Sequence, residues 1–266
     1  MASDPSIADA DGYGAAQPKV GTISPPDLID VLIKGLADFK EMPTHIVFLC
    51  LIYPIVTLIF ARAYSGHDIL PLVFPLLAGY TLIGPLAATG MYELSRRREK
   101  GLDFSRSKAF HVLRRHSARS IGLLGAMLMV IYIAWLVTAL NLWEKNFGTV
   151  APVSIQEFAT QVFLTADGWE LMIVGSGVGF LFAVVVFSLS VVSFPMLMDR
   201  DVGVVMAVQT SIKAVLKNPV TMGMWGFIVA GFLLVGSLPF FVGLCIVLPV
   251  LGHSTWHLYR KVIEHD

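Results

Sequence analysis

The uneven distribution of lysine and arginine is the feature that most constrains this 266-residue chain. Long apolar runs lie at residues 44–61, 69–91, 120–140, 171–197 and 221–258. Each of the first four is about as long as a helix that crosses a membrane, ~20 residues, and the last is nearly twice that length. Because the last run contains Gly236-Ser237-Leu238-Pro239, we interpret it as two spans, 221–237 and 239–258. If the N-terminus is cytoplasmic, 17 of the 19 basic residues lie on the cytoplasmic side. The positive-inside rule therefore predicts six transmembrane helices with both termini in the cytoplasm.

Composition supports a membrane protein and argues against a soluble domain. Hydrophobic residues make up 56% of the chain and charged residues 14%. The segment between the second and third spans is strongly basic, and we expect it to meet anionic lipid headgroups rather than nucleic acid. Residues 1–24 are rich in Ala, Asp, Gly, Pro and Ser, which predicts a disordered acidic cytoplasmic tail. The membrane domain is then expected over residues 25–262.

An internal repeat is predicted from three amphipathic segments, each of which precedes a pair of spans. These segments are residues 26–42, 104–117 and 202–218. Helices with one apolar and one basic face lie in the plane of the membrane interface. Residues 85–97 also align without a gap with residues 249–261, and residues 195–200 repeat part of the pattern. We therefore predict an all-α, polytopic membrane helical bundle with three interfacial helices and a threefold internal repeat, in which spans two, four and six surround a pseudo-threefold axis.

Four strings that mix polar and apolar residues carry a resemblance to a known family. They are Tyr92–Glu99, Phe194–Asp201, Asn218-Pro219 with Trp225-Gly226, and Leu248–Arg260. These strings resemble a family of bacterial integral membrane proteins catalogued only as domain of unknown function 2189. The resemblance covers about residues 25–262 and implies a location in the bacterial inner membrane. It implies no activity, because none is assigned to the family.

The central parts of the spans contain no ionisable residue, although such a residue would be the usual sign of a functional site. This argues against ion-coupled transport and against hydrolysis within the membrane. The sequence also lacks a Gly-rich phosphate loop, a His-Glu-x-x-His motif, paired cysteines and a nucleophile elbow. The run Gly175-Ser176-Gly177-Val178-Gly179 is typical of a surface on which helices approach closely. We therefore expect no enzyme activity, no cofactor and no metal.

A candidate polar cluster lies at the cytoplasmic ends of the even-numbered spans and consists of Glu93, Asp199, His253 and His257. His253 and His257 are four residues apart and share a helix face, so two imidazoles and a carboxylate offer metal-ligand chemistry in principle. The favoured alternative is that these residues pair with nearby arginines at the membrane interface, for example Glu93 with Arg97. The spacing of the two histidines is by itself a weak signal. No catalytic, cofactor-binding or metal residue is therefore assigned.

The outer connection, residues 141–169, is the one sizeable feature expected outside the membrane. Trp143 and Trp169 are expected in the outer aromatic belt. A short surface helix is indicated by the spacing of four apolar residues, Ile155, Phe158, Val162 and Phe163.

Three hypotheses about function follow. The first is a non-enzymatic membrane protein that acts through contacts with lipid, with a membrane-protein partner or with copies of itself. The second is a permease or carrier for a neutral or lipid-like small molecule, because internal repeats and helices interrupted by proline are common in transporters. A wide cavity open to one side would favour the carrier. The third is an enzyme, which would require the side chains of five residues to converge: Glu93, Asp199, Asp201, His253 and His257.

Overall fold

The computed structural model describes residues 18–42, 55–56, 58–59, 62, 67–78, 80–103, 118–239 and 241–264. Its elements are α1 (Pro25–Glu41), the 3-10 helix η1 (His67–Leu72), α3 (Val73–Ala78), α4 (Tyr80–Glu99), α5 (Ala118–Phe147), α6 (Ile155–Leu164), α7 (Ala166–Ser190), α8 (Ser193–Asp199), α9 (Val204–Lys217), α10 (Pro219–Ser237) and α11 (Leu244–Val262). The all-α fold class is confirmed for this part of the chain. The predicted helix at 104–117 and all but four residues of the span at 44–61 lie outside it.

Three helices in the described part of the chain are long and apolar enough to cross a membrane. They are Ala118–Phe147, Ala166–Asp199 (α7 continued by α8) and Pro219–Ser237. They correspond to three of the predicted spans. The predicted span at 69–91 is divided among η1, α3 and α4. α11 is not among the three, because His253, His257, Arg260 and Lys261 make its second half polar. The predicted number of six spans is therefore not confirmed.

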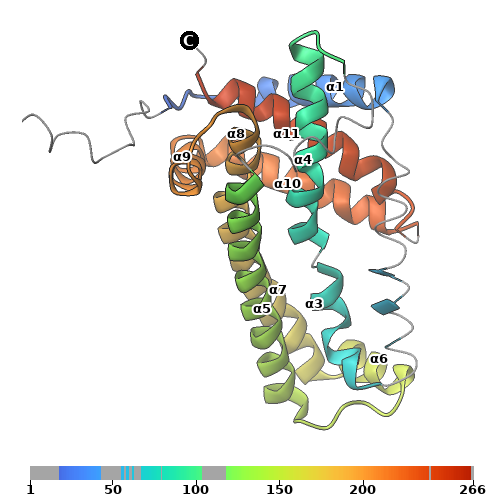
Figure 1. Cartoon of the computed structure of the whole chain (residues 1–266). Coiled ribbons are helices and arrows are strands. Elements are labelled where there is room, and N and C mark those ends of the chain that lie inside the picture. Colours follow the sequence, from blue (N-terminus) through green and yellow to red (C-terminus); the bar gives the residue numbers. More distant parts are fainter. Residues whose placement is uncertain are drawn as a thin grey trace, which may run out of the picture.

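The helices are arranged as a long shaft with a crosswise layer at one end (Figure 1). α5 and α7 run together along the shaft, whereas α1 and α11 lie across its upper end. α9 is seen nearly end-on beside them, so it lies across the shaft as segment 202–218 was predicted to do. The threefold repeat is not confirmed, because α4 and α7 run along the molecule while α11 crosses it.

The interior has a large core at the crosswise layer and a smaller one at the other end. Trp225, Trp256 and Phe194 are fully buried in the large core. The smaller core holds Trp143 and Phe158 and lies among η1, α3, α5 and α6. Trp143 is thus covered by protein rather than placed in an aromatic belt, whereas Trp169 is 58% exposed.

The two ends of the described chain lie side by side. Val20 and Ile263 form an isolated antiparallel β-bridge, and Gly21 N donates to Val262 O at 2.7 Å. Ile23 N donates to the side-chain oxygen of Asn218, which is the residue before α10. Residues 19–23, at the end of the predicted disordered tail, are therefore held against α11 and α10. The first and last described residues therefore lie on one side of the protein.

α1 is positioned by its capping and by the residues of its buried face. Asp27 accepts hydrogen bonds from both the backbone and the hydroxyl of Ser24, which fixes the first turn. Its buried face contains Leu28, Val31, Gly35 and Asp38 and packs mainly on α11. A second apolar strip, formed by Ile29, Ile33 and Leu36, is exposed. The sequence predicts one apolar face that meets lipid. In the structure, one apolar strip of α1 packs on α11 and another is exposed.

Candidate functional site

A buried polar junction forms where α1, α4 and α11 meet. α1 supplies Asp38, α4 supplies Ser95 and Arg98, and α11 supplies His253 and His257. The two residues from α4 are three apart and the two from α11 are four apart, so each pair shares one helix face. We refer to these five residues as the Asp38 junction.

The Asp38 junction depends on a close approach of α1 to α11. Gly35 lies one turn before Asp38, and a Cβ atom added to it would lie 2.0 Å from Ser254 Oγ and 2.6 Å from Ser254 N. Only glycine fits this position. The approach carries Asp38 onto the face of α11 that presents His253 and His257.

Each of the other four junction residues is within hydrogen-bonding distance of Asp38 or of one of its partners. Ser95 Oγ donates to Asp38 Oδ2 at 2.5 Å, and His257 Nε2 lies 2.9 Å from the same oxygen. Arg98 Nη1 donates to Asp38 Oδ1 at 2.5 Å. Asp38 is only 4% exposed, so these three contacts replace the water that the carboxylate loses on folding.

The electrostatic balance keeps Asp38 ionised. Burial alone would raise the pKa of this carboxyl group, but the hydrogen bonds from His257 and Ser95, together with Arg98, outweigh burial and lower the pKa to about 2. The junction therefore holds a buried negative charge between one guanidinium and two imidazoles.

His253 is fully buried and has one unusual feature. Its Nδ1 lies 2.7 Å from Ser95 Oγ. Because the single hydroxyl proton of Ser95 is given to Asp38, Nδ1–H of His253 is the donor to Ser95. In a neutral ring this leaves Nε2 as an acceptor, and Nε2 has no hydrogen-bond partner among the described residues.

Serine, histidine and aspartate together invite comparison with a hydrolase triad, but the connectivity differs. In a triad the serine gives its proton to histidine, and the aspartate holds the other ring nitrogen. Here Ser95 gives its proton directly to Asp38, and Ser95 and His253 are 1% and 0% exposed. The connectivity of the Asp38 junction is therefore not that of a hydrolase triad.

The structure divides the predicted polar cluster among three places. His253 and His257 belong to the Asp38 junction. Glu93 is buried and accepts from Arg96 Nε at 3.0 Å and from Arg97 Nε at 2.8 Å, which confirms the predicted pairing with Arg97.

The remaining carboxylate of that cluster, Asp199, lies against the end of α11. It accepts from Tyr259 Oη at 2.9 Å and from Arg260 Nη1 at 3.4 Å. Asp201, which an enzyme would have required, is exposed. Within the ranges that the structure describes, no group of three or more His, Cys, Asp or Glu side chains is placed to hold a metal ion.

Asp38 is the functional candidate that the sequence analysis missed. A signal for it exists, because Leu28, Val31, Gly35 and Asp38 follow helical spacing on one face. A carboxylate in line with two buried apolar residues indicates a buried partner. Assigning the apolar face to lipid concealed that signal.

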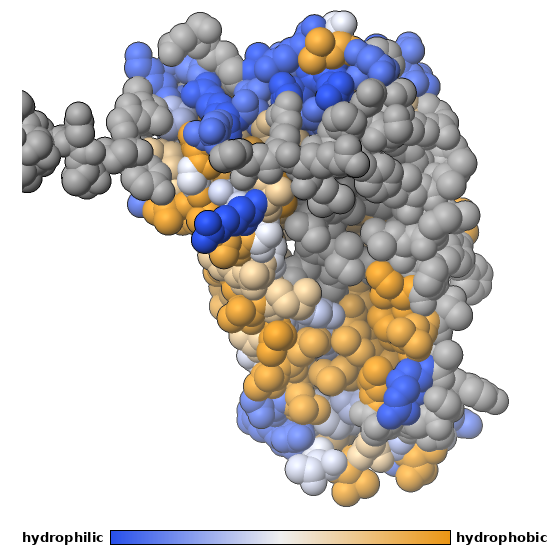
Figure 2. All heavy atoms as spheres, viewed as in Figure 1, coloured by the Kyte–Doolittle hydropathy of each residue, from blue (hydrophilic) through white to orange (hydrophobic). Residues whose placement is uncertain are grey.

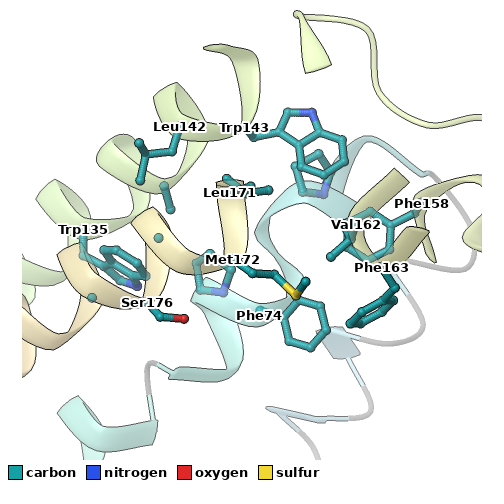
Figure 3. A pocket seen from close by; sticks show the side chains of 15 residues that line it. Phe74, Trp135, Leu142, Trp143, Phe158, Val162, Phe163, Leu171, Met172 and Ser176 are labelled. Carbon is teal, nitrogen blue, oxygen red and sulfur yellow. The ribbon is translucent and has the colours of Figure 1, made fainter. Parts of the chain in front are cut away.

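A second candidate site is an apolar cavity of about 400 Å³ at the opposite end of the shaft (Figure 3). It lies among α3, α5, α6 and α7, beside the smaller core. Its lining residues are Pro71, Phe74, Pro75, Trp135, Ala139, Leu142, Trp143, Phe158, Val162, Phe163, Leu171, Met172, Gly175, Ser176 and Gly179. The predicted short helix on the outer connection is confirmed as α6, and it forms one wall through Phe158 and Phe163.

The small-residue run of α7 makes room at this cavity. A Cβ atom added to Gly175 or Gly177 would meet no atom within 4 Å, whereas one added to Gly179 would lie 3.2 Å from the Trp135 ring. The predicted close helix contact is therefore present at Gly179 alone of these three glycines. At Gly175 the missing side chain leaves open space.

Comparison with known proteins agrees with the membrane character of these helices. A search of curated proteins and a search of solved structures found no match. A family model covers the segment from α3 to α8, which contains α5 and α7, and leaves α1 and α11 outside. The resemblance seen in the sequence strings is thus confirmed over residues 73–199, which match the family DUF2189, described as a predicted integral membrane protein.

Proposed function

We propose that this chain is a non-enzymatic integral membrane protein that acts through contacts with lipid or with a membrane partner, a second copy of itself included. The observation that carries the proposal is apolar surface left uncovered by the chain. Only 17% of the most apolar 18-residue window of α5 is buried within the protein, and only 22% of that of α10. Figure 2 shows hydrophobic side chains over the shaft, below a mainly hydrophilic upper end, with hydrophilic and hydrophobic residues mixed at the lower end. Apolar surface of this extent marks contact with a membrane or with protein.

The exposed side of α10 has the spacing of a helix-packing seam. Its exposed apolar residues recur at intervals of four and three: Val220, Met224, Phe227, Leu234 and Leu238, with Gly231 in the same series. The ring of Phe227 stacks on Phe180 of α7 with centroids 6.4 Å apart. We call the five exposed residues the α10 stripe. The stripe continues the exposed surface of α7 and is suited to a neighbouring apolar helix or to acyl chains.

The Asp38 junction supports a structural role rather than catalysis. Its members are turned toward one another, and its one carboxylate is bound by three donors. Through Asp38, the junction fixes α1, the first described helix of the chain, against α4 and α11. A rigid end layer of this kind holds the exposed helices in place for contacts along the shaft.

We also propose that the protein lies in the bacterial inner membrane, crosses it several times and keeps both termini in the cytoplasm. The adjacency of residues 19–23 and 262–264 supports a common side for the termini. The basic residues Arg96 and Arg97 lie at the same end as Arg260, which fits a cytoplasmic assignment by the positive-inside rule.

A carrier for a neutral or lipid-like small molecule is a second candidate function. The observation that favours it is the apolar cavity at the far end of the shaft, because such a cavity is suited to an uncharged ligand.

Purification in mild detergent, followed by native mass spectrometry, tests the main proposal. We expect wild-type protein to retain bound lipid or a reproducible partner. We expect the triple variant Val220→Gln, Phe227→Gln, Leu234→Gln to lose at least half of it. The matched control is Val205→Gln with Leu216→Gln, at two exposed apolar positions of α9, and should retain it. A bare wild-type monomer in every mild detergent would contradict the proposal, as would equal retention by the stripe variant.

A further inference from the structure

The cavity at the far end of the shaft has the chemistry of a hydrocarbon site. Aromatic side chains line it, with Trp135 on one side and Phe74 and Phe163 on the other (Figure 3). Among the described residues that line it, none is charged, and Ser176 supplies the only hydroxyl group. A polar or charged ligand would leave its own groups unpaired here, whereas a hydrocarbon chain would not. Its volume of about 400 Å³ is in the range of sites that bind small ligands.

The cavity is elongated along α5. It extends along α5 from Trp143 to Trp135, eight residues or about 12 Å of helix. Near its Trp143 end, Lys145 forms an exposed ion pair with Glu170 at 3.3 Å. One end of the cavity is thus close to charged surface, and the other lies deep within the apolar shaft.

The walls of the cavity belong to the helices that expose apolar side chains outward. Val137 of α5 and Ile173 of α7 are 55% and 69% exposed on the faces away from it. Membrane lipid, which these faces would meet, is then the most abundant source of hydrocarbon beside the cavity.

We propose that this cavity binds one hydrocarbon chain supplied by the membrane, with the polar head of the molecule beside Lys145 and Glu170. This inference rests on the proposed membrane location. It specifies one of the proposed lipid contacts, namely a single hydrocarbon chain in this cavity. Two molecules carry such a chain, a phospholipid and a free fatty acid, and the experiment distinguishes them.

The test uses the full chain in lipid nanodiscs made of phosphatidylethanolamine and phosphatidylglycerol. One sample contains a phospholipid with a photoreactive diazirine near the end of one acyl chain. The other contains a fatty acid with the same group. After illumination, cross-linked peptides are identified by mass spectrometry. We expect labelling on the cavity-lining residues of α5 and α7, such as Ala139, Leu142 and Met172, above that on the outward-facing residues Val137 and Ile173. The probe that gives the stronger labelling identifies the source of the chain.

Two glycines of α7 provide a matched pair of variants. Gly175 lines the cavity, Gly177 does not, and neither has an atom within 4 Å of an added Cβ. Gly175→Leu should fill the cavity and lower its labelling at least fivefold, whereas Gly177→Leu should leave labelling within twofold of wild type. Ala139→Met fills the space from α5 and replaces Gly175→Leu if that variant does not fold.

The outcomes separate this inference from the main proposal. Cavity labelling that is equal in wild type and in the filled variants, or no greater than that of the outward faces, would overturn the hydrocarbon site. The proposed contacts along the α10 stripe would stand in that case. A wild-type protein that co-purifies with no lipid or partner in mild detergent, but keeps its cavity labelling in nanodiscs, would overturn the main proposal alone.

Discussion

Replacing Asp38 with asparagine should lower the free energy of unfolding by about 3 kcal/mol. The change removes the buried negative charge and leaves Arg98 and His257 facing an uncharged amide. Breaking a buried charged pair from one side is costly, and here the amide no longer compensates the partly buried guanidinium of Arg98. Equilibrium unfolding in detergent micelles, followed by circular dichroism, measures the loss.

Asp30→Asn is the matched control for this variant, because Asp30 is also on α1 and also meets two basic groups. Its contacts with Lys34 and Lys261, both at 2.9 Å, are partly exposed, so its loss should cost less than about 1 kcal/mol. Equal effects of the two substitutions would show that the junction does not hold a buried charge.

The pH dependence of the Asp38→Asn effect gives a second check. The pKa of Asp38 is lowered from 3.8 to about 2, so its stabilisation is complete above about pH 4 and is lost as the pH falls through 2. The wild type should lose about 2 kcal/mol of stability over this interval through Asp38, whereas the variant lacks this loss. The gap between the two proteins should therefore narrow on acidification. A gap that is constant or that widens would contradict the assignment.

Gly35→Ala should be the other strongly destabilising change, with a loss of about 3 kcal/mol. The new methyl group would overlap Ser254 Oγ at 2.0 Å and the Ser254 backbone nitrogen at 2.6 Å, and backbone atoms cannot move aside by a change of rotamer. α1 must then move away from α11, which also pulls Asp38 from His257. The effects of Gly35→Ala and Asp38→Asn should therefore be less than additive in the double variant.

Gly223→Ala on α10 is the control for helix propensity. A Cβ atom at this position meets nothing within 4 Å, so the change should be neutral or stabilising by up to about 1 kcal/mol. Adding Ser254→Gly to Gly35→Ala should restore part of the lost stability, because it removes the hydroxyl but not the backbone contact. Wild-type stability of Gly35→Ala alone would show that α1 and α11 do not pack as described.

Features that arise from local sequence could be predicted. The apolar stretches of α5, α7 and α10 are predicted as helices, because a long apolar segment in a membrane must satisfy its backbone hydrogen bonds internally. The pair between Glu93 and Arg97 followed from their spacing on one helix turn. The short helix α6 followed from the positions of Phe158 and Val162.

The Asp38 junction could not be predicted in the same way. Asp38 and His257 are 219 positions apart, and no local pattern links them. Their contact depends on the close approach at Gly35, which a single sequence shows only as one glycine in an amphipathic helix. The histidines were identified as notable, but their carboxylate partner was sought at Glu93 and Asp199, on helices predicted to be equivalent by repeat.

α11 shows why an apolar run in a sequence does not always correspond to a membrane-spanning helix. Its first half is as apolar as a membrane helix, but in its second half a carboxylate of α1 meets His257, and Glu99 of α4 meets Arg260. The sequence predicts these residues at the polar end of a span, whereas they form part of the partly buried contact surface of a crosswise helix.

The most direct test of the membrane arrangement is labelling of single cysteines in spheroplasts with a maleimide that does not cross membranes. Lys19→Cys, Lys145→Cys and Glu264→Cys are each made in a chain with Cys50→Ser and Cys245→Ser. We predict that the cysteine at 145 reacts in intact spheroplasts, while those at 19 and 264 react only after the membrane is opened. Reaction of either terminal position in intact spheroplasts, or of all three positions alike, would contradict an integral membrane protein with both ends in the cytoplasm.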